Sequence, residues 1–567
     1  MSIKYAQHVS TKNTPQSEPI PGKAMVPNSA GGFAFPVDDW TRLDRFLVLG
    51  NEAGTYYASE QKLTIENAAC VLRCLTSAPD GPARVVGRIV EISTSGRAPK
   101  NDAAVFALAL VASRGAAQPD AVRLALAALP RVCRTGTHLF QFVAACRELR
   151  GWGRALRRAV ADWYLSKDAG ARAYQVLKYQ QRNGWSHRDL LRLTHPKAAG
   201  SLNDVLHWSV KGWPGVGEAP HPNAALQRIW AFERLKRSPS AALACRMIRD
   251  YGLTREMIPT ELLADASVWE SLLEQMPFTA MLRNLATMTR VGLLTPLSSA
   301  ANTVSAALAD SDRLRKARVH PVAILTALKT YAQGHGERGK NAWTPVPQVI
   351  DALDGAFYKA FGNVEPTGKR WLLALDVSGS MGGSMVAGVP NLSAREASAA
   401  LALVTAAVEP EHAFVAFTSS GWQSAAAGKG QWANMGYNNG ISTLSISPRQ
   451  RLDDVVKAIS DLPMGGTDCA LPMLWATEHR VAVDAFVVLT DNETWAGAVH
   501  PTQALQQYRQ RTGIPAKLIV VGMTATGFSI ADPADAGSMD VVGFDANVPA
   551  LMADFVGGQQ TGLSPDE

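Results

Sequence analysis

The chain has 567 residues, of which 47% are hydrophobic and 19% charged, a composition typical of a globular protein with two or more domains. The sequence contains no apolar run near the roughly 18 residues that a membrane span needs, and Met1–Lys4 opens no apolar signal segment, so we expect a cytoplasmic protein. The net charge of +7 is uneven: from Trp371 onward there are 9 Lys and Arg against 19 Asp and Glu, a charge of −10, which leaves +17 on the first 370 residues.

The first two thirds of the chain predict helices behind a short leader. Residues 1–30 are rich in Pro, Gly and Asn turn signals, and we expect them to be flexible. From about residue 40 to residue 361, apolar residues recur at spacings of three and four, which predicts one helix after another. The clearest helices are expected at 102–113, 121–129, 138–150, 152–166, 171–181, 224–236 and 321–331. Such a succession indicates a helical-repeat solenoid, although no strict repeat period is visible.

Within this region the segment 121–200 is strongly basic, with 15 Lys and Arg against 4 Asp and Glu, a local charge of +11. A positive field on this scale indicates a polyanionic partner, since basic faces without a ligand are usually shorter. Lys and Arg bind phosphates, while Trp, Tyr and His can stack on bases, so RNA is the expected partner. The candidate RNA-binding residues of the segment are Arg134, Arg154, Lys178, Arg182, His187 and Arg188.

The run Arg-Asn-Gly-Trp at 182–185 predicts the end of a helix, with its glycine just after the cap. Ser186 is a candidate N-cap for the next helix, which places His187 and Arg188 in a first turn whose backbone N–H groups favour anions. For His187, an RNA contact and an exposed bystander both stay open, whereas Trp185 is expected in the core.

A second basic set lies at 316–321 and in the glycine-rich loop 334–340. The backbone of such a loop can cradle a phosphate. The loop can equally be an ordinary turn between domains, and both interpretations stay open.

The pattern changes after residue 365. Continuous apolar runs predict buried strands, and amphipathic stretches predict helices between them. The strands are expected at 370–376, 413–417, 485–489 and 517–521, and the helices at 393–408, 451–459 and 502–511. Strands alternating with helices favour a parallel, doubly wound α/β sheet. Residues 419–447 are rich in Gly, Ser, Asn and Ala and are interpreted as a long surface loop.

Three polar segments of this α/β region predict a metal site. Asp376, Ser378 and Ser380 follow the first strand, Thr467 follows a pair of glycines, and Asp491 follows another strand. Because the carboxyl ends of parallel strands meet at one edge of a sheet, these side chains are expected in one crevice. Hard hydroxyl and carboxylate oxygens suit Mg²⁺ or Mn²⁺, and so few carboxylates leave a coordination position for an acidic group of a partner.

A lone Asp-x-Ser-x-Ser turn is more often a helix cap than a metal site, so the prediction depends on all three segments together. Their order resembles the metal-ion-dependent adhesion site of von Willebrand factor A domains. The sequence contains no motif typical of a hydrolase or a nucleotide-binding loop, and we expect no enzyme activity. Asp468 and Glu493 are therefore interpreted as supporting residues rather than as an acid and a base.

Longer motifs across the chain closely resemble the Ro ribonucleoprotein autoantigen family, the TROVE-module proteins, in a bacterial form. They run from about residue 32 to about residue 555 and include Gln-Arg-Asn-Gly-Trp-Ser-His at 181–187. The other motifs lie at 45–57, 60–63, 153–158, 275–277, 282–285, 364–370, 465–472 and 490–494. Residues 1–31 lie outside the resemblance, and the loop 419–447 looks longer than in animal members.

The resemblance implies a multidomain protein with an all-α, HEAT-like helical-repeat ring at 31–365 and an α/β von Willebrand factor A domain at 366–556. A flexible leader (1–30) and a tail (557–567) flank them. It implies Y RNA, a small noncoding RNA, on the basic outer surface and single-stranded 3′ ends of misfolded RNAs in the hole of a monomeric ring. It further implies an adaptor in RNA quality control and stress recovery, joined through Y RNA to an exoribonuclease of the polynucleotide phosphorylase type.

Carried over by motif, four basic residues become candidate contacts for Y RNA, and two become weaker candidates for the hole or the seam between domains. The first group is His187, Lys178, Arg182 and Arg134, and the second is Arg318 and His320. A different class of function stays open as the alternative, a metal-dependent protein-adhesion module in which the helical part is only a frame. The location of the positive charge in the helical part favours RNA.

Overall fold

A computed structural model of the chain describes residues 13–50, 63–95, 97–98, 100–115, 118–317, 319, 321–336, 341–360, 366–384, 392–419, 440–448, 450–460, 462, 465–524, 526–542 and 548–557. The chain divides into two compact units. We call Leu63–Ala360 the helical unit, and Met1–Lys62 together with Phe361–Glu567 the sheet unit. No helix in the described ranges is long and apolar enough to cross a membrane.

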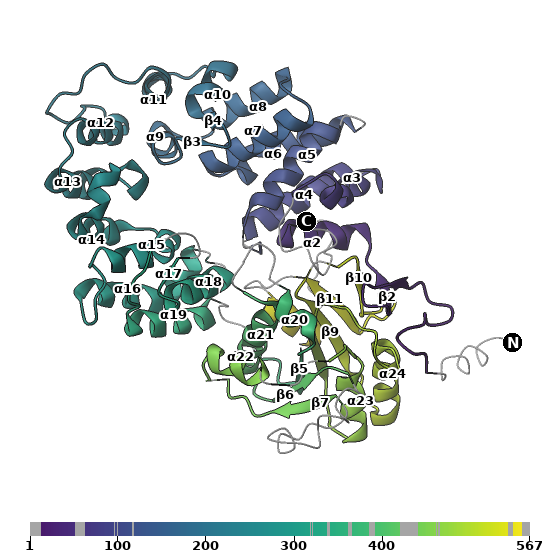
Figure 1. The fold of residues 1–567 in the computed structure, drawn as a ribbon. Coiled ribbons are helices and arrows are strands. Elements are labelled where there is room, and N and C mark those ends of the chain that lie inside the picture. The colour runs from purple at the N-terminus through teal and green to yellow at the C-terminus, as the bar shows by residue number, and fades with distance from the viewer. Residues whose placement is uncertain are drawn as a thin grey trace. The chain divides into compact units, whose positions relative to one another are not determined.

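The helical unit consists of short helices that pack mainly against helices close to them in sequence, such as α4 on α6 and α5 on α7. Its elements are the 3₁₀ turn Glu66–Ala68, α3 (Ala69–Thr76), α4 (Gly81–Ser95), α5 (Asp102–Arg114), α6 (Pro119–Val132), α7 (Gly136–Leu149), α8 (Arg154–Leu165), α9 (Ala169–Lys178), β3 (Gln181–Arg182), β4 (Trp185–Ser186), α10 (His187–Thr194), α11 (Gly200–Lys211), α12 (Ala224–Arg237), α13 (Ala241–Tyr251), the 3₁₀ turns Arg255–Met257 and Thr260–Ala264, α14 (Ala266–Gln275), α15 (Phe278–Arg290), α16 (Ser299–Ala309), α17 (Ser311–Ala317), α18 (Pro321–Ala332) and α19 (Pro347–Lys359). Figure 1 shows the helices following one another in chain order from α3 to α19.

All the helices predicted in this unit are present, with ends shifted by at most three residues. Some of them begin at side chains that accept hydrogen bonds from free backbone N–H groups, as Thr135 does for α7 and Asp168 for α9. The apolar faces are buried, for example Phe140 and Phe142 of α7. The closed ring implied by the family resemblance concerns the placement of the two units and stays a prediction.

The predicted helix end at 182–185 is wrong. Helix α9 already ends at Lys178, and residues 181–186 form a tight β-hairpin in which Arg182 pairs with Trp185. Asn183 and Gly184 both have positive φ angles, 51° and 74°. A two-residue loop with positive φ at both positions is the type I′ turn that Asn-Gly favours, so the dipeptide is a hairpin signal here and not a helix cap.

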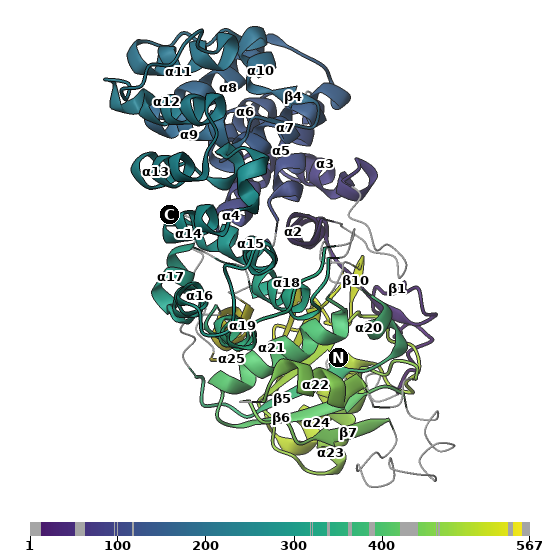
Figure 2. The ribbon, with the colours of Figure 1, turned by 60° about the vertical axis from the view of Figure 1, so that its left-hand side comes forward.

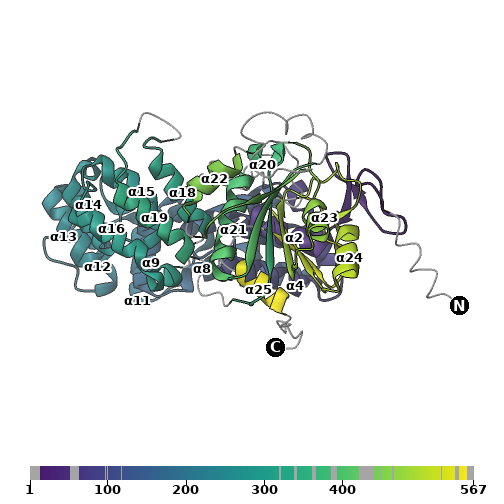
Figure 3. The same cartoon turned by 90° about the horizontal axis from the view of Figure 1, so that it is seen from below.

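The sheet unit is built on a six-stranded sheet with the order β11-β9-β8-β5-β6-β7. Its strands are β5 (Trp371–Asp376), β6 (His412–Phe417), β7 (Ile441–Leu444), β8 (Ala485–Thr490), β9 (Lys517–Gly522) and β11 (Ser538–Val542), and its helices are α20 (Gly379–Gly383), α21 (Ala394–Val408), α22 (Leu452–Ser460), α23 (Leu471–Glu478), α24 (Pro501–Thr512) and α25 (Val548–Gly557). Helices α21 and α22 cover one face and α23 and α24 the other (Figure 3). This is the predicted doubly wound arrangement.

The sheet is mixed rather than purely parallel. Five strands are parallel, and β7 pairs antiparallel with β6 at the edge. The expected surface loop at 419–447 is therefore corrected at 441–444, where Ile441 is buried opposite Phe417. Residues 420–439 of that loop lie outside the described ranges.

The register of the central strands positions the predicted metal ligands. Strand β5 lies between β6 and β8, with Leu375 opposite Leu489 and Asp376 opposite Phe417. Every residue of β5 and β8 is buried, which explains why both read as unbroken apolar runs. The polar residues that follow them, among them Asp491, therefore emerge at one edge of the sheet.

The N-terminal residues belong to the sheet unit. Strand β2 (Phe33–Pro36) pairs with β1 (Val26–Pro27) and with β10 (Phe528–Ser529). Helix α2 (Asp39–Leu49) follows, and its buried Arg45 forms an ion pair with Asp540 at 2.7 Å. Two expectations are corrected by these contacts: residues 13–30 are not a flexible leader, and residues 31–50 do not belong to the helical unit. We call residues 13–36 the N-terminal strap.

Candidate metal centre and basic surface

The turn after β5 brings three of the predicted ligands together. Asp376 accepts hydrogen bonds from the backbone N–H of Ser378 at 2.9 Å and from the Oγ1 of Thr490 at 2.6 Å. The hydroxyls of Ser378 and Ser380 are 3.0 Å apart. Asp491 is buried, and its Oδ1 accepts a hydrogen bond from the backbone N–H of Glu493 at 3.2 Å. The structure therefore joins the β5 and β8 segments at one crevice, as their positions after neighbouring strands predict.

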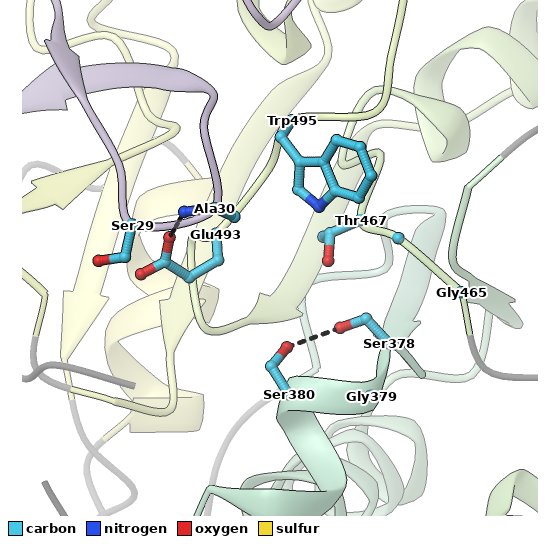
Figure 4. A pocket seen from close by; sticks show the side chains of 10 residues that line it. Ser29, Ala30, Ser378, Gly379, Ser380, Gly465, Thr467, Glu493 and Trp495 are labelled. Atoms are coloured by element: carbon cyan, nitrogen blue, oxygen red, sulfur yellow. Dashed lines mark hydrogen bonds between the residues drawn. The ribbon is translucent and has the colours of Figure 1, made fainter. Parts of the chain in front are cut away.

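Thr467 joins the same crevice from the third segment. A cavity of about 390 Å³ is lined by Ser378, Gly379, Ser380, Gly465, Gly466, Thr467, Glu493, Trp495, Ser29 and Ala30. Figure 4 shows the hydroxyls of Ser378 and Ser380 on one side of this pocket and Thr467 beside Trp495 on another. All five predicted ligands are buried; Ser378, Ser380 and Thr467 line the pocket, whereas Asp376 and Asp491 are not among its lining residues.

The electrostatics of the crevice favour a cation. Burial, followed by the negative charge of Asp491, raises the pKa of Asp376 to about 7. Burial also raises the pKa of Asp491. Two buried carboxylates this close repel each other, and a divalent ion between them would remove that repulsion. Among the residues that the structure describes, the Oδ2 of Asp491 has no hydrogen-bond partner, so a buried acceptor is left over.

The donor set fits a hard divalent ion. The three hydroxyl-bearing candidate ligands line the pocket, and the buried carboxylates of Asp376 and Asp491 belong to the same two segments as Ser378 and Glu493, a set of hard oxygen donors that suits Mg²⁺ or Mn²⁺ and not a soft metal. No group of three or more His, Cys, Asp or Glu side chains within the described ranges could hold a metal. A search for His and Cys clusters would therefore miss this site, since Ser and Thr supply most of its ligands.

Sequence reasoning missed the residues that hold this crevice in shape. Buried Arg395 of α21 donates to the carbonyls of Val377 and Ser378, both at 3.0 Å, and fixes the turn after β5. Burial lowers the pKa of Arg395, although the charge of Asp376 acts against it. The Oγ1 of Thr418 donates to the carbonyl of Gly466 at 2.7 Å and fixes the glycine pair before Thr467.

Asp468 and Glu493 face the N-terminal strap. Asp468 accepts from the Nε2 of Gln16 at 2.7 Å and from the backbone N–H of Ala470 at 3.0 Å. Glu493 accepts from the backbone N–H of Ala30 at 3.1 Å. Burial raises the pKa of Asp468 to about 6 and also raises that of Glu493. Both carboxylates thus have structural partners, in accord with the supporting role expected of them.

In the helical unit, the buried Trp185 ring connects three basic segments. The guanidinium of Arg147 lies 5.4 Å from its centre, and the ring of Trp152 meets it edge-on at 5.6 Å. Arg154 begins α8 two residues after Trp152, and Arg182 pairs with Trp185 across the hairpin. Figure 2 shows α7, α8 and α10 gathered around β4. The structure therefore brings the exposed side chains of Arg154 and Arg182 to one neighbourhood, and Trp185 is in the core as predicted.

Arg188 is exposed on the first turn of α10. Ser186 is the N-cap of that helix and forms a capping box with Asp189, which confirms the predicted helix start. Lys178 is half-buried, and its amino group donates to the hydroxyl of Tyr174 at 3.0 Å. Arg134 is exposed, and it donates to the hydroxyl of Ser93 at 2.8 Å.

His187 is not where the sequence places it. Its side chain is 3% exposed, it shares a 2.7 Å hydrogen bond with the hydroxyl of Tyr164, and it packs against Phe140. Burial, and then the charge of Arg172, lowers the pKa of His187 to about 3. A side chain buried to this extent is not the exposed bystander that the sequence left open, and in this structure it presents almost no surface to a ligand. Arg318 and His320 lie outside the described residues, as do 337–340 of the loop 334–340.

Comparison with known proteins agrees with both halves of this architecture. The TROVE domain family matches residues 26–211 and 231–330, and the Ro60 vWA domain family matches residues 370–556. A protein of Deinococcus radiodurans named RNA-binding protein RO60 is 43% identical over 549 residues, which cover 96% of this chain and 98% of that protein. The chain belongs to the Ro60 family.

A second Ro60 relative, a protein of Caenorhabditis elegans with the same name, is 37% identical over 607 residues, covering 94% of this chain and 90% of that protein. The crystal structure of the Deinococcus radiodurans RO (RSR) protein matches with a TM-score of 0.69 at 42% identity, over 92% of this chain and all of that one. The resemblance inferred from the motifs is thereby confirmed. A helical TROVE region followed by a von Willebrand factor A domain is also confirmed as the fold of this Ro60 chain.

Proposed function

We propose that this chain is an RNA-binding scaffold whose helical unit takes the RNA phosphates. Membership of a family whose relatives are named RNA-binding proteins supports the class of ligand. The observation that carries the location is the charge: residues 121–200 hold 15 Lys and Arg against 4 Asp and Glu, and Arg154, Arg182 and Arg188 are exposed there. Residues 371–567, which carry a charge of −10, repel phosphates, so RNA is expected on the helical unit and not on this part of the sheet unit.

The proposal extends to the partners that the family resemblance implies. Structured Y RNA binds the basic outer surface of the helical unit, and 3′ ends of misfolded RNAs bind separately. The chain itself contributes no catalysis, and an exoribonuclease reaches it through the RNA. The exposed arginines of this chain support the binding of structured RNA, since exposed Arg and Lys recognise an RNA duplex through its phosphates.

Salt dependence tests the RNA-binding proposal. Because Lys and Arg displace counterions from RNA, the logarithm of the affinity should fall linearly with the logarithm of the salt concentration. Arg182→Ala should reduce that slope by about 1, as expected for one lost phosphate contact. Arg123→Ala is the matched control, because Arg123 is in the same basic segment but already pairs with Asp120 at 3.0 Å. Gel shifts that stay flat over salt would contradict the proposal.

The metal site forms the second part of the proposed function. Ser378, Ser380 and Thr467 of the pocket wall, with the buried carboxylates of Asp376 and Asp491, would hold Mg²⁺ or Mn²⁺ in the sheet unit. When bound, such an ion would offer a coordination position to an acidic group of a partner. Arg395 and Thr418 fix the turns that carry the hydroxyls of Ser378 and Thr467, and the buried residues around the pocket limit the access of water to it.

Protein adhesion through this pocket is the alternative function. Trp495 favours it, because this residue lines the pocket and its large apolar side chain is 44% exposed. Pull-downs with and without RNase, and with and without EDTA, separate the alternatives. Partners lost with RNase support the RNA scaffold, and partners lost only with EDTA support the adhesion module.

A further inference from the structure

The wall of the metal pocket is completed by residues from the opposite end of the chain. Ser29 and Ala30 line the cavity together with Ser378 and Thr467. The backbone N–H of Ala30 binds the carboxylate of Glu493, 463 positions later in the sequence. Figure 4 shows Ser29 and Ala30 beside Glu493 at the pocket. Part of this wall therefore forms only when the N-terminal strap is docked.

Gln16 of the strap is buried with all its hydrogen-bonding capacity used. Its Nε2 donates to Asp468 at 2.7 Å and to the carbonyl of Val499 at 2.8 Å. Its Oε1 accepts from the hydroxyl of Thr494 at 2.5 Å and from the backbone N–H of Gly497 at 3.2 Å. One amide thus ties the loop after the glycine pair to the loop after β8.

These two loops carry metal ligands. Thr467 directly precedes Asp468, and its carbonyl accepts from the backbone N–H groups of Trp495 and Ala496, both at 3.0 Å. Thr494 and Gly497, the two partners of the Gln16 carbonyl oxygen, flank those two residues. Gln16 therefore fixes the backbone on both sides of the contact that positions Thr467.

The strap fits these loops too closely for a shift to be accommodated. A Cβ added to Gly32 would lie 2.0 Å from the carbonyl oxygen of Thr494. A Cβ added to Gly497 would lie 2.4 Å from both Asp468 and Gln16. Asn28 adds a hydrogen bond of 2.6 Å from its Nδ2 to the carbonyl of Thr494. A side chain at Gly32 would collide with the backbone of Thr494 and Trp495, and one at Gly497 would displace the side chains of Asp468 and Gln16, so glycine suits both positions.

We propose that the N-terminal strap is a positioning element of the metal site. Gln16 holds the Thr467 loop in its binding arrangement, and the turn at Ser29–Ala30 bounds the pocket beside Glu493. Docking of the strap and binding of a divalent ion therefore stabilise each other, and this coupling must act equally in both directions. The inference rests on the proposed metal function. It adds that Ser29 and Ala30, which line the pocket, restrict which acidic groups of a partner can reach the ion.

Calorimetric titration of the full-length chain with Mn²⁺ and with Mg²⁺ tests the first direction of the coupling. Gln16→Ala and Gly32→Ala should each weaken ion binding by about tenfold, the size typical of a lost supporting residue at a metal site. Lys23→Ala is the matched control: Lys23 is in the same strap, it pairs at 2.8 Å with Asp532, and neither residue lines the pocket. This variant should bind both ions as the wild type does, because the contacts of Gln16 and Ala30 with the ligand loops stay in place.

Hydrogen exchange on the wild-type chain tests the second direction without any variant. Added Mg²⁺ should slow exchange at the strap amides of Gln16, Ala30 and Phe33, which bond to Gly497, Glu493 and Gln16 respectively. Two results would overturn the strap's role and leave the metal function standing. In the first, Gln16→Ala and Gly32→Ala bind the ion as tightly as the wild type does. In the second, the ion does not change hydrogen exchange at the strap amides. A wild-type chain that binds neither ion overturns the metal function itself.

Discussion

At the scale of single residues, His187 lies within the basic segment, as its motif predicts, but its side chain is buried and not exposed. It directly follows the hairpin that carries Arg182, yet its ring lies in the core against Phe140 and Tyr164. We infer that any effect of His187 on RNA binding passes through the shape of the hairpin and α10. The exposed arginines around it are the residues available to phosphate.

The buried state of His187 predicts a pH dependence of stability. Its pKa in the folded chain is about 3, below the ordinary value near 6.5, so the unfolded chain takes up the proton first. The contribution of the neutral ring is therefore complete above pH 6.5 and is lost as the pH falls from 6.5 toward 3. Relative to His187→Phe, which cannot titrate, the wild type should lose at most about 1.4 kcal/mol of unfolding free energy per pH unit in that window. Urea denaturation at several pH values measures this difference, and a constant difference would contradict the assignment.

The two neighbouring carboxylates predict that Asp491→Asn has opposite effects on thermal stability without and with a bound ion. Without an ion, burial and then the negative charge of Asp491 raise the pKa of Asp376; because Asp491→Asn removes that charge, it should raise the thermal midpoint of the ion-free chain. The same change removes a charged ligand, so the midpoint should no longer rise on addition of Mg²⁺. Thermal unfolding with EDTA and with Mg²⁺ measures both effects. An ion-free midpoint that falls would argue against repulsion between the two carboxylates.

At the scale of elements, the hairpin β3–β4 shows why the local prediction failed. The run Arg-Asn-Gly-Trp at 182–185 predicts a helix end, because helices often end with a glycine at the C′ position. The pairing of Arg182 with Trp185, and the burial of that tryptophan against Arg147 and Trp152, selects the hairpin instead. Tertiary packing of one aromatic ring thus decides the conformation of a four-residue segment.

Glycine substitutions test the importance of this hairpin. Gly184 has a φ of 74°, where an L-residue costs about 1 kcal/mol, so Gly184→Ala should lower stability and displace Arg182. Gly87→Ala in helix α4 is the control: nothing lies within 4 Å of an added Cβ, and alanine should stabilise the helix by about 0.5–1 kcal/mol. Chemical denaturation and RNA gel shifts measure the two consequences. Equal RNA affinity for Gly184→Ala and the wild type would show that the turn does not position the basic side chains.

The proposed metal crevice could be predicted because its candidate ligands follow local rules. Asp376 ends one buried strand and Asp491 directly follows another, and the ends of neighbouring parallel strands must meet. Gln16, Arg395 and Trp495 could not be predicted, because none belongs to a recognisable pattern near the ligands. The hydrogen bond from Gln16 to Asp468 spans 452 positions, and only the folded chain brings the two together.

At the scale of the whole molecule, the separation of charge is the property most relevant to RNA. The sequence alone established it, since counting charges needs no structure. The fold adds which side chains are exposed, and it removes His187 from the set. The boundary between the units could not be predicted from the sequence. Residues 13–50 belong to the same unit as residues 361–567, but neither their charge nor their hydropathy indicates this.

Reversing charge on the acidic unit tests whether its field acts on RNA. Asp453 and Asp454 are exposed on α22, and replacing both with lysine changes the net charge by four. We expect a several-fold gain in RNA affinity at low salt that vanishes near 1 M salt, where the screening length falls to about 3 Å. Fluorescence anisotropy with a labelled RNA measures it. Equal affinity at low salt would show that bound RNA lies beyond the reach of this surface.

The division of the sheet unit between the two ends of the chain determines the order of events during synthesis. Strand β2 is made early, yet its partner β10 and the loop bound by Gln16 are made more than 450 residues later. At about 5–20 residues per second, the nascent hairpin β1–β2 waits on the order of half a minute or more with an unpaired edge. The helical unit, which is continuous in sequence, has time to fold in that interval. An unpaired edge bearing Phe35 is a site for wrong pairing, so translation speed and chaperone access should affect the yield of this protein more than that of one whose domains are each continuous.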